Sequence, residues 1–290
     1  MVFLTALFTS KDLIKQLFSF KNLPQTPFIP WICSHAAKLE QISVQAMLTN
    51  PTLLARAFQN TQKLYGYDVI INVFDPVLEA EACGCPIRWG KEYELPSIYP
   101  MHEYEKIVQL EIEKRGRIPI VLEAMRRLKI VLGRMVAVAG VVTGPLNLAS
   151  LLTGNNIIHV LEEKPEEAKK VMNVAGQVVM KICKAYCELE PDLIVVTENL
   201  LPQIPSEHFQ FILSIFKPIL NLISFYNAKS VLLLKECTPE KLEEIFKSGF
   251  RMDAVVVNTN FDVTELKKVC LLYTSPSPRD LSTSRMPSSA

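Results

Sequence analysis

The stretch VAVAGVVTGPLNLASLLTG, residues 136–154, carries the clearest indication of fold in this chain. Val136–Val142 is an almost continuous apolar run, which is typical of a parallel strand covered on both faces. The longer apolar stretch Met135–Leu152 also contains glycine, proline and asparagine. We therefore interpret it as a buried strand that runs into a loop, and not as a membrane span.

Runs of the same kind alternate along the chain with amphipathic patterns of helical period. Several helical patterns open with proline, serine or threonine, the usual chemistry of a helix N-terminus. The other predicted strands are Phe28–Ile32, Val69–Phe74, Leu193–Thr197, Ser230–Leu234 and Ala254–Asn258. The predicted helices are Thr52–Tyr65, Val121–Leu132, Pro165–Glu188, Ser206–Phe225 and Pro239–Ser248.

This alternation of strands and helices predicts βαβ units and an α/β fold. No glycine-rich phosphate-binding motif follows any predicted strand, which disfavours nucleotide binding. Two architectures remain, an open doubly wound sheet and a (β/α)8 TIM barrel. We favour the TIM barrel, truncated after about six βα units. Residues 84–118 form a longer polar excursion that we expect at the barrel mouth.

The tail Cys270–Ala290, CLLYTSPSPRDLSTSRMPSSA, resembles the in-frame translation of a transposase-type sequencing adapter. The alternative is a natural disordered tail rich in serine and proline. Non-native segments are excluded from fold reasoning. We therefore expect one barrel domain, residues 1–269, that is incomplete at its C-terminus, followed by a non-native tail at residues 270–290.

The composition excludes several functional classes. The formal net charge is +1 and no basic run interleaves with aromatic residues, so we predict no nucleic-acid partner. Hydrophobic residues make up 49% of the chain, enough for a substantial core. The N-terminal residues lack the basic region and cleavage site of a secretory signal. We therefore predict a reducing, cytoplasmic location without membrane association.

The densest cluster of polar side chains begins with Asp75, directly after the predicted strand Val69–Phe74. On a barrel, catalytic groups lie at the C-terminal ends of strands. An aspartate there can accept hydrogen bonds from pyrrole-type N–H groups or act as a general acid or base. Because proline follows it, Asp75 is equally well explained as a helix N-cap. Glu79 and Glu81 are two residues apart and do not share a helical face, which disfavours a paired-carboxylate mechanism.

Two further groups of candidate residues end predicted strands. After Val136–Val142, a Gly-Pro pair either lets the backbone approach a ligand closely or simply forms a tight βα turn. After Leu193–Thr197, a carboxylate and an amide side chain follow in sequence. The residues are Thr143, Gly144, Pro145 and Asn147 in the first group, and Glu198 and Asn199 in the second.

The order and spacing of these segments resemble the uroporphyrinogen decarboxylase (URO-D) superfamily. That superfamily also contains cobalamin-dependent methyltransferases, which move methyl groups between corrinoid proteins and thiols. The resemblance implies a (β/α)8 barrel, in agreement with the strand pattern. It is carried by Pro27–Ile32, Asp68–Gly84, Gly140–Gly154 and Leu193–Pro218.

Departures from the decarboxylases disfavour that activity here. The decarboxylases carry an Arg-Gln-Ala-Gly-Arg loop after the first strand, whose cations bind substrate carboxylates. The matching stretch Ile32–Ala36 contains no arginine, the residue best suited to carboxylates. Their tyrosine after the Gly-Pro turn corresponds to Leu151, and their serine after the fourth strand corresponds to Asn199. Only the aspartate is retained, as Asp75.

The sequences Glu-Ala-Glu-Ala-x-Gly and Thr-Gly-Pro are closer to the methyltransferase branch. Those enzymes hold a zinc that activates a thiol, using His-x-Cys after the fifth strand and a later cysteine. The matching positions here are Leu234, Lys235 and Glu236, with Cys237 just beyond. The sequence therefore does not support zinc, and we expect the later cysteine to lie past residue 269.

The resemblance implies an enzyme of methyltransferase type that binds a tetrapyrrole, corrinoid or other methyl-transfer substrate at the barrel mouth. A corrinoid protein is the candidate partner, and no cofactor is assigned. The alternatives are uroporphyrinogen decarboxylase and a non-catalytic barrel that binds a corrinoid or a partner. The predicted catalytic residues are Asp75 and Glu198, and the predicted substrate-binding residues are His35, Thr143, Gly144, Pro145, Asn147, Asn199 and Lys235.

Overall fold

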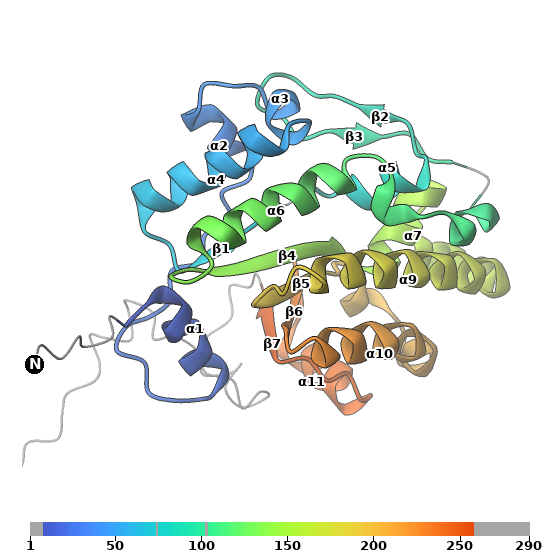
Figure 1. Ribbon diagram of the computed structural model, residues 1–290. Coiled ribbons are helices and arrows are strands. Elements are labelled where there is room, and N and C mark those ends of the chain that lie inside the picture. The colour runs from blue at the N-terminus through green and yellow to red at the C-terminus, as the bar shows by residue number, and fades with distance from the viewer. Residues whose placement is uncertain (1–7, 74, 102–103, 258–290) are drawn as a thin grey trace, which may run out of the picture.

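A curled parallel sheet with helices packed along its outer side forms the body of the molecule (Figure 1). The computed structural model describes residues 8–73, 75–101 and 104–257, so the predicted domain end and the tail lie outside the described residues. In this part of the chain the main sheet has the order β1-β4-β5-β6-β7, and every neighbouring pair is parallel. Such a sheet is about half of a (β/α)8 barrel, which confirms the predicted fold class.

The strands and helices alternate as the periodicity predicted. The main strands are β1 (Val69–Ile71), β4 (Ala137–Thr143), β5 (Leu193–Thr197), β6 (Lys229–Leu234) and β7 (Ala254–Val257). The α-helices are α1 (Ser10–Phe18), α2 (Ser34–Leu39), α3 (Val44–Leu48), α4 (Pro51–Tyr65), α5 (Leu78–Cys83), α6 (Ile118–Leu132), α7 (Pro145–Thr153), α8 (Ile157–Glu163), α9 (Pro165–Cys187), α10 (Phe209–Phe225) and α11 (Pro239–Lys247). The excursion 84–118 contains an antiparallel hairpin of β2 (Ile87–Arg88) and β3 (Ser97–Ile98). The 3₁₀ helices are η1 (Glu105–Gln109), η2 (Ile112–Lys114), η3 (Leu201–Gln203) and η4 (Ser206–His208).

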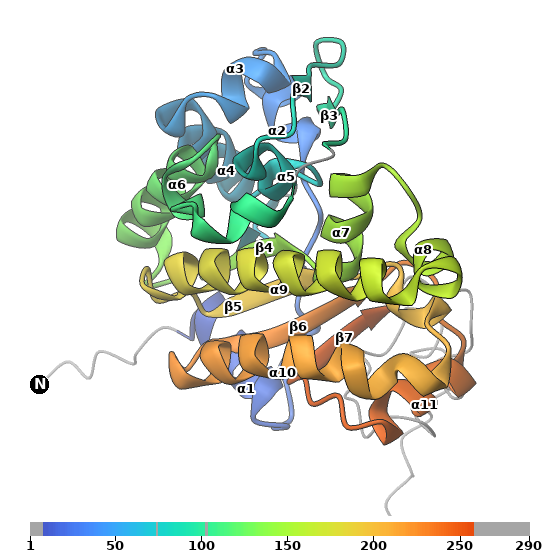
Figure 2. The same cartoon turned by 90° about the vertical axis from the view of Figure 1, so that its right-hand side faces the viewer.

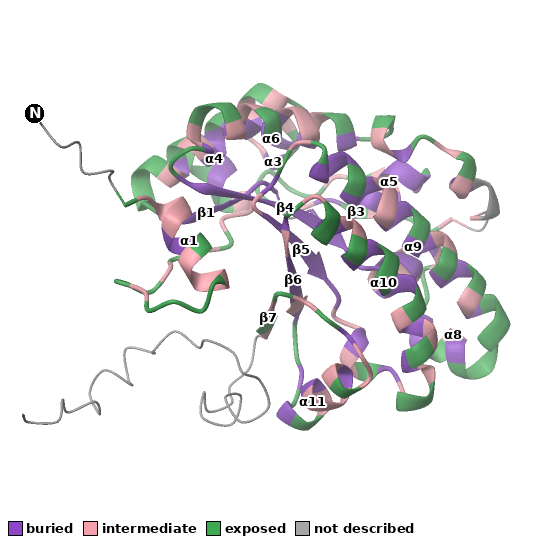
Figure 3. Ribbon diagram, turned by 60° about the horizontal axis from the view of Figure 1, so that its bottom comes forward, coloured by how far each residue is buried: buried purple, intermediate pink, exposed green. Residues whose placement is uncertain are grey.

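Each strand contributes alternate side chains to two apolar layers. In β4, Val138 and Val142 pack into the large core between the sheet and the outer helices. Ala137 and Val141 point to the other, concave face, where Ile14 of α1 packs against them. The sheet is buried along most of its length (Figure 3). Coverage of both faces explains why the strands are almost continuously apolar.

The predicted strand Phe28–Ile32 is wrong, because this segment is not part of the sheet. Asp68 N donates to Phe28 O at 2.8 Å, but Phe28 N donates to the Asp68 side chain instead of to a neighbouring strand. Pro30 has no N–H group, so a ladder of backbone hydrogen bonds cannot continue through it.

The predicted loop after the strand β4 is also wrong, because Pro145–Thr153 forms helix α7. Pro145 occupies the first turn, and Gly154 ends the helix in the left-handed conformation with φ of 72°. Both are standard signals for the start and end of a helix. Because residues 135–152 are mostly apolar, these two helix signals were not distinguished from a loop after the strand.

One helical segment in the described residues, Ser206–Phe225, is long and apolar enough to cross a membrane. Its α-helical part, α10, lies beside α9 on the outer side of the sheet (Figure 2). Phe209, Ile212 and Phe216 are buried there. In this fold the apolar face of α10 is therefore a core surface.

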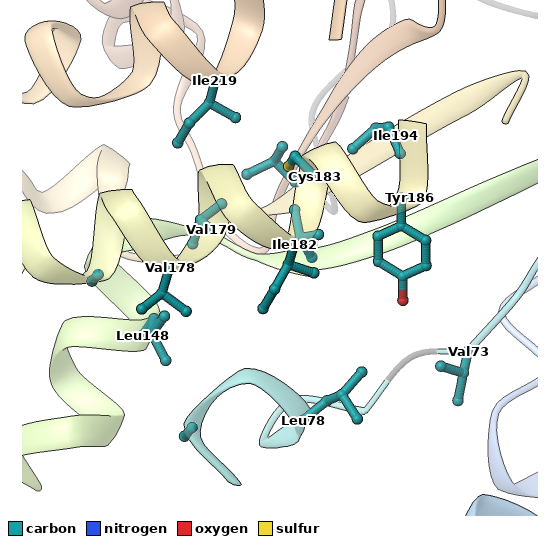
Figure 4. Close-up of a cluster of buried hydrophobic side chains, with 14 of the residues drawn as sticks. Val73, Leu78, Leu148, Val178, Val179, Ile182, Cys183, Tyr186, Ile194 and Ile219 are labelled. Carbon is teal, nitrogen blue, oxygen red and sulfur yellow. The ribbon is translucent and has the colours of Figure 1, made fainter. Parts of the chain in front are cut away.

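Two fully buried tyrosines differ in how their hydroxyl groups are satisfied. The Tyr67 hydroxyl donates to Phe58 O and shares a hydrogen bond with the Thr61 hydroxyl, both at 2.9 Å. Tyr186, on α9, points toward the segment that carries Val73 and Leu78 (Figure 4). Its hydroxyl has no hydrogen-bond partner within the described ranges. An unpartnered buried hydroxyl costs about 1–3 kcal/mol of desolvation.

We expect Tyr186→Phe to raise the free energy of unfolding by about 1 kcal/mol, because it removes an unpartnered polar atom. The matched control Tyr67→Phe should lower it by about 1 kcal/mol, because it removes made hydrogen bonds. Urea denaturation of the two variants and the parent measures both changes. Equal losses would contradict the assignment of the Tyr186 hydroxyl as unpartnered.

Candidate functional site

A cavity of about 730 Å³ lies beyond the C-terminal ends of β4 and β5. Ile98 and Pro100, from the excursion 84–118, line one side of it. The described side chains that line the cavity carry no formal charge, but many can form hydrogen bonds. These polar lining residues are Thr143, Asn147, Ser150, Asn155, Asn156, Thr197 and Asn199.

Glu198 supports the part of the cavity wall that the first turn of α7 forms. Its Oε2 accepts a hydrogen bond from Leu146 N at 2.9 Å, and its Oε1 accepts one from Asn147 N at 3.1 Å. These N–H groups belong to the first turn of α7, where the helix supplies no backbone acceptors. Gly144 makes this approach possible, because a Cβ atom there would lie 2.2 Å from Glu198 Oε2. The Gly-Pro turn thus makes room for a protein carboxyl group.

Glu79 holds the same turn from the other side. Its Oε1 accepts a hydrogen bond from Thr143 N at 2.9 Å. Burial raises the pKa of Glu79 to about 7, while its hydrogen bonds with Thr143 oppose that rise. Burial likewise raises the pKa of Glu198 to about 8, against the N–H groups that stabilise its carboxylate form. Two carboxyl groups with strongly raised pKa values therefore flank the β4–α7 turn.

Asp75 is buried in an ion pair with Arg117, whose Nη1 donates to the Asp75 carboxylate. Arg117 Nε also donates to Glu81 at 2.7 Å, and its guanidinium carbon lies 5.0 Å from the centroid of the Trp89 ring. Asp75 Oδ1 accepts a hydrogen bond from Val77 N at 3.1 Å. Val77 is the N-cap residue of α5, so Asp75 precedes the helix and is not its cap.

The excursion 84–118 begins and ends on helix α5. It leaves from Gly84, the C-cap residue of that helix. On its return, Arg115 Nε donates to Ala82 O at 2.9 Å, and Arg117 reaches Asp75. Sequence reasoning did not identify Arg117, because it lies 42 residues from Asp75 and in no recognisable motif.

The predicted site residues fall into distinct positions. Thr143, Asn147 and Asn199 line the cavity. Asn147 Nδ2 donates to Thr197 O at 3.0 Å. Asn199 Oδ1 is buried without a hydrogen-bond partner in the described part of the chain. Leu151, which replaces the decarboxylase tyrosine in the resemblance, also lines the cavity.

The remaining predicted residues do not line this cavity. Asp75 and Glu198 are buried and are not among the lining residues, and Gly144 and Pro145 form the turn that Glu198 supports. His35 and Lys235 are both exposed at other places on the surface, with His35 Nε2 2.9 Å from the Tyr65 hydroxyl. Roles for these residues in substrate binding or catalysis stay predictions.

The zinc site implied by the resemblance does not fit the residues after β6. Leu234 is buried in the core, and Lys235 and Glu236 are exposed. Cys237 Sγ lies 3.5 Å from Thr238 O. Within the described ranges, no three histidine, cysteine, aspartate or glutamate side chains form a group that could hold a metal.

A curled parallel sheet, outer helices and a cavity beyond the strand ends define a protein of the (β/α)8-barrel class. Residues 9–275 match the family model described as uroporphyrinogen decarboxylase (URO-D), and the chain belongs to that family. Its fold is similar to that of a methyltransferase from Methanosarcina mazei, with a TM-score of 0.76 and 22% identity. That similarity covers 90% of this chain and 80% of the other.

The curated relatives are methyltransferases. The methylcobamide:CoM methyltransferase MtaA of Methanosarcina barkeri is 26% identical over 155 residues, which are 52% of this chain and 46% of MtaA. The methylated-thiol–coenzyme M methyltransferase of Methanosarcina mazei is 30% identical over 120 residues, 40% of this chain and 32% of that enzyme. The chain thus matches less than half the length of these relatives.

Glu198 makes folding stability depend on pH. Its pKa is about 8 in the folded chain and about 4.5 in the unfolded one, so folding takes up a proton between these values. Its contribution to stability is complete below about pH 4.5 and declines as the pH rises through about 8. Glu198→Gln should therefore reduce the fall in the free energy of unfolding across this range. Urea denaturation at several pH values measures the slope, which changes by up to about 1.4 kcal/mol per pH unit for one proton.

An unchanged slope in Glu198→Gln would contradict this assignment. Exposed Glu162→Gln is the matched control, and its slope should equal that of the parent.

Proposed function

We propose that this chain is part of a methyltransferase that binds a methylcorrinoid in the cavity beyond β4 and β5. The observation that carries the proposal is the uncharged lining of that cavity, in which asparagine, serine and threonine side chains lie among apolar ones. Corrinoids carry amide side chains, which both donate and accept hydrogen bonds. Asparagine, serine and threonine side chains complement such groups without charge. The methyltransferase relatives support the same reading.

The same lining argues against a substrate rich in carboxylates. A porphyrinogen with several acidic side chains needs charge-assisted donors, for which arginine is best suited. Arg117 is already engaged with Asp75 and Glu81. The stretch Ile32–Ala36 contains no arginine. Decarboxylation of a porphyrinogen is therefore the less supported function.

Two asparagines are the proposed ligand contacts. Asn199 offers a buried Oδ1 atom that accepts no hydrogen bond from the described residues. Asn147 is fixed by its own N–H and Nδ2 groups, so its orientation toward the cavity is set before a ligand binds.

A corrinoid protein is the proposed partner, because it would present the methylcorrinoid to the cavity. The proposed location is the cytoplasm. In the described part of the chain, Cys33, Cys83, Cys85, Cys183 and Cys187 are free thiols, which suits a reducing compartment.

Ultraviolet–visible titration of the chain with methylcobalamin tests the proposal. We expect Asn199→Ala and Asn147→Ala each to weaken binding about 5- to 10-fold, the loss of one neutral hydrogen bond. Asn60→Ala is the matched control, since Asn60 is exposed on α4 and bonds Glu40 away from the cavity. Its affinity should equal that of the parent.

Uroporphyrin, which carries carboxylates, serves as the competing probe in the same titration. Preference for uroporphyrin over methylcobalamin would favour decarboxylase-type recognition and contradict the proposal. Equal effects of the three asparagine variants would show that methylcobalamin binds elsewhere.

A further inference from the structure

One side of helix α7 lines the cavity, and the last position on that side is a glycine. The lining residues of this helix and its C-cap are spaced i, i+3, i+4 and i+7, so they follow one face of the helix. They are Asn147, Ser150, Leu151 and Gly154. Gly154 is the C-cap residue, with φ of 72°. The helical wall of the cavity therefore ends at a position without a side chain.

Pro100 of the excursion occupies the space that a side chain at position 154 would need. A Cβ atom at Gly154 would lie 2.7 Å from Pro100 Cγ and 2.8 Å from Pro100 Cβ. The pyrrolidine ring is bonded to its own backbone nitrogen, so it cannot rotate away as a flexible side chain could. A larger residue at position 154 would therefore displace the excursion itself.

Backbone hydrogen bonds hold the excursion on both sides of Pro100. Met101 N donates to Leu152 O at 2.9 Å, and this carbonyl group lies in the last turn of α7, where the helix supplies no donors. Tyr99 N donates to Pro86 O at 2.9 Å, next to the C-terminal end of α5. Pro100 lies between these two contacts and lines the cavity. Its position against α7 is thus set by the fold.

We propose that Gly154 is a specificity-determining residue: because it has no side chain, Pro100 closes the cavity at the end of α7 and limits the bulk that a ligand can place there. This inference rests on the proposed function for the class of ligand, a methylcorrinoid. The contact between Pro100 and Gly154 is independent of that class.

The position of Pro100 can be tested without any ligand. Cys85 is 3% exposed and immediately precedes Pro86, whose carbonyl group holds Tyr99. We expect Gly154→Ala to displace the excursion and to make Cys85 react about 5- to 10-fold faster with iodoacetamide, because a buried thiol reacts through local opening. Mass spectrometry of peptides from the alkylated full chain measures the rate.

Gly66→Ala is the matched control for backbone strain. Gly66 is the C-cap residue of α4 and is also left-handed, with φ of 66°, but a Cβ atom there would have nothing within 4 Å. Both substitutions place alanine in the left-handed region, and only Gly154→Ala adds the collision with Pro100. Gly66→Ala should leave the rate at Cys85 unchanged relative to Cys183, a fully buried thiol of α9.

Titration with two corrinoids tests the specificity. Methylcobalamin and methylcobinamide share the corrin ring and its amide groups, but only methylcobalamin carries the bulky nucleotide loop. The ratio of Kd for methylcobalamin to Kd for methylcobinamide should fall about 5- to 10-fold in Gly154→Ala, because the displaced excursion admits more bulk. Gly66→Ala should keep the ratio of the parent.

Pro100→Ala provides a second variant that leaves the glycine in place, in case Gly154→Ala does not fold. It removes the outer ring atoms that close the cavity, so the ratio should fall in the same direction. In the double variant the fall should be smaller than the two single effects combined, because both substitutions act on one contact.

The outcomes separate this inference from the proposed function. A ratio that neither Gly154→Ala nor Pro100→Ala changes overturns the inference, and so does an equal acceleration at Cys85 in Gly66→Ala. A parent that binds neither corrinoid overturns the proposed function, and the rates at Cys85 then decide whether Gly154 sets the position of Pro100.

Discussion

The cavity depends on how the β4–α7 turn is held by two buried carboxyl groups. Strand β4 ends at Thr143, and the N–H groups of Leu146 and Asn147 in the first turn of α7 have no acceptor within the helix. Glu198 accepts both of these N–H groups, and Glu79 accepts the N–H of Thr143. Each carboxyl group is fully buried, so the turn is fixed by hydrogen bonds whose strength increases in low dielectric surroundings. The residues that line the cavity are positioned as a consequence.

Much of the fold could be predicted because apolar runs dictate it. Strands β4, β5, β6 and β7 fall where continuous valine, isoleucine and leucine runs predicted them, since both faces of the sheet are covered. Phe28–Ile32 is also largely apolar, but Pro30 has no backbone N–H group to donate to a neighbouring strand. Helix α7 was not predicted, because its apolar residues continue the apolar run of the strand before it.

The site was only partly predictable, because its contacts are long-range. Thr143, Asn147 and Asn199, which were predicted from their positions near strand ends, line one cavity, and their role in binding stays a prediction. Arg117 joins Asp75 across 42 residues, and no local pattern encodes that pairing. The spacing of Glu79 and Glu81 excluded a shared helical face, but the two carboxyl groups serve different partners, Thr143 and Arg117. The spacing of residues within a helix shows which face each side chain occupies. It does not show which residues of other elements pack against that face.

Both ends of the excursion 84–118 contact helix α5: Gly84 is the C-cap of the helix, and at the other end Arg115 bonds Ala82 O and Arg117 bonds Glu81. Its middle part contributes Ile98 and Pro100 to the cavity, and its secondary structure is a two-residue ladder and two short 3₁₀ helices. Ile107 and Ile112, further along the excursion, are buried in the main core and tie it to the body of the molecule. Exchange of Ile98 or Pro100 alone would therefore change the shape of the cavity, while the acidic groups that hold the β4–α7 turn would stay in place.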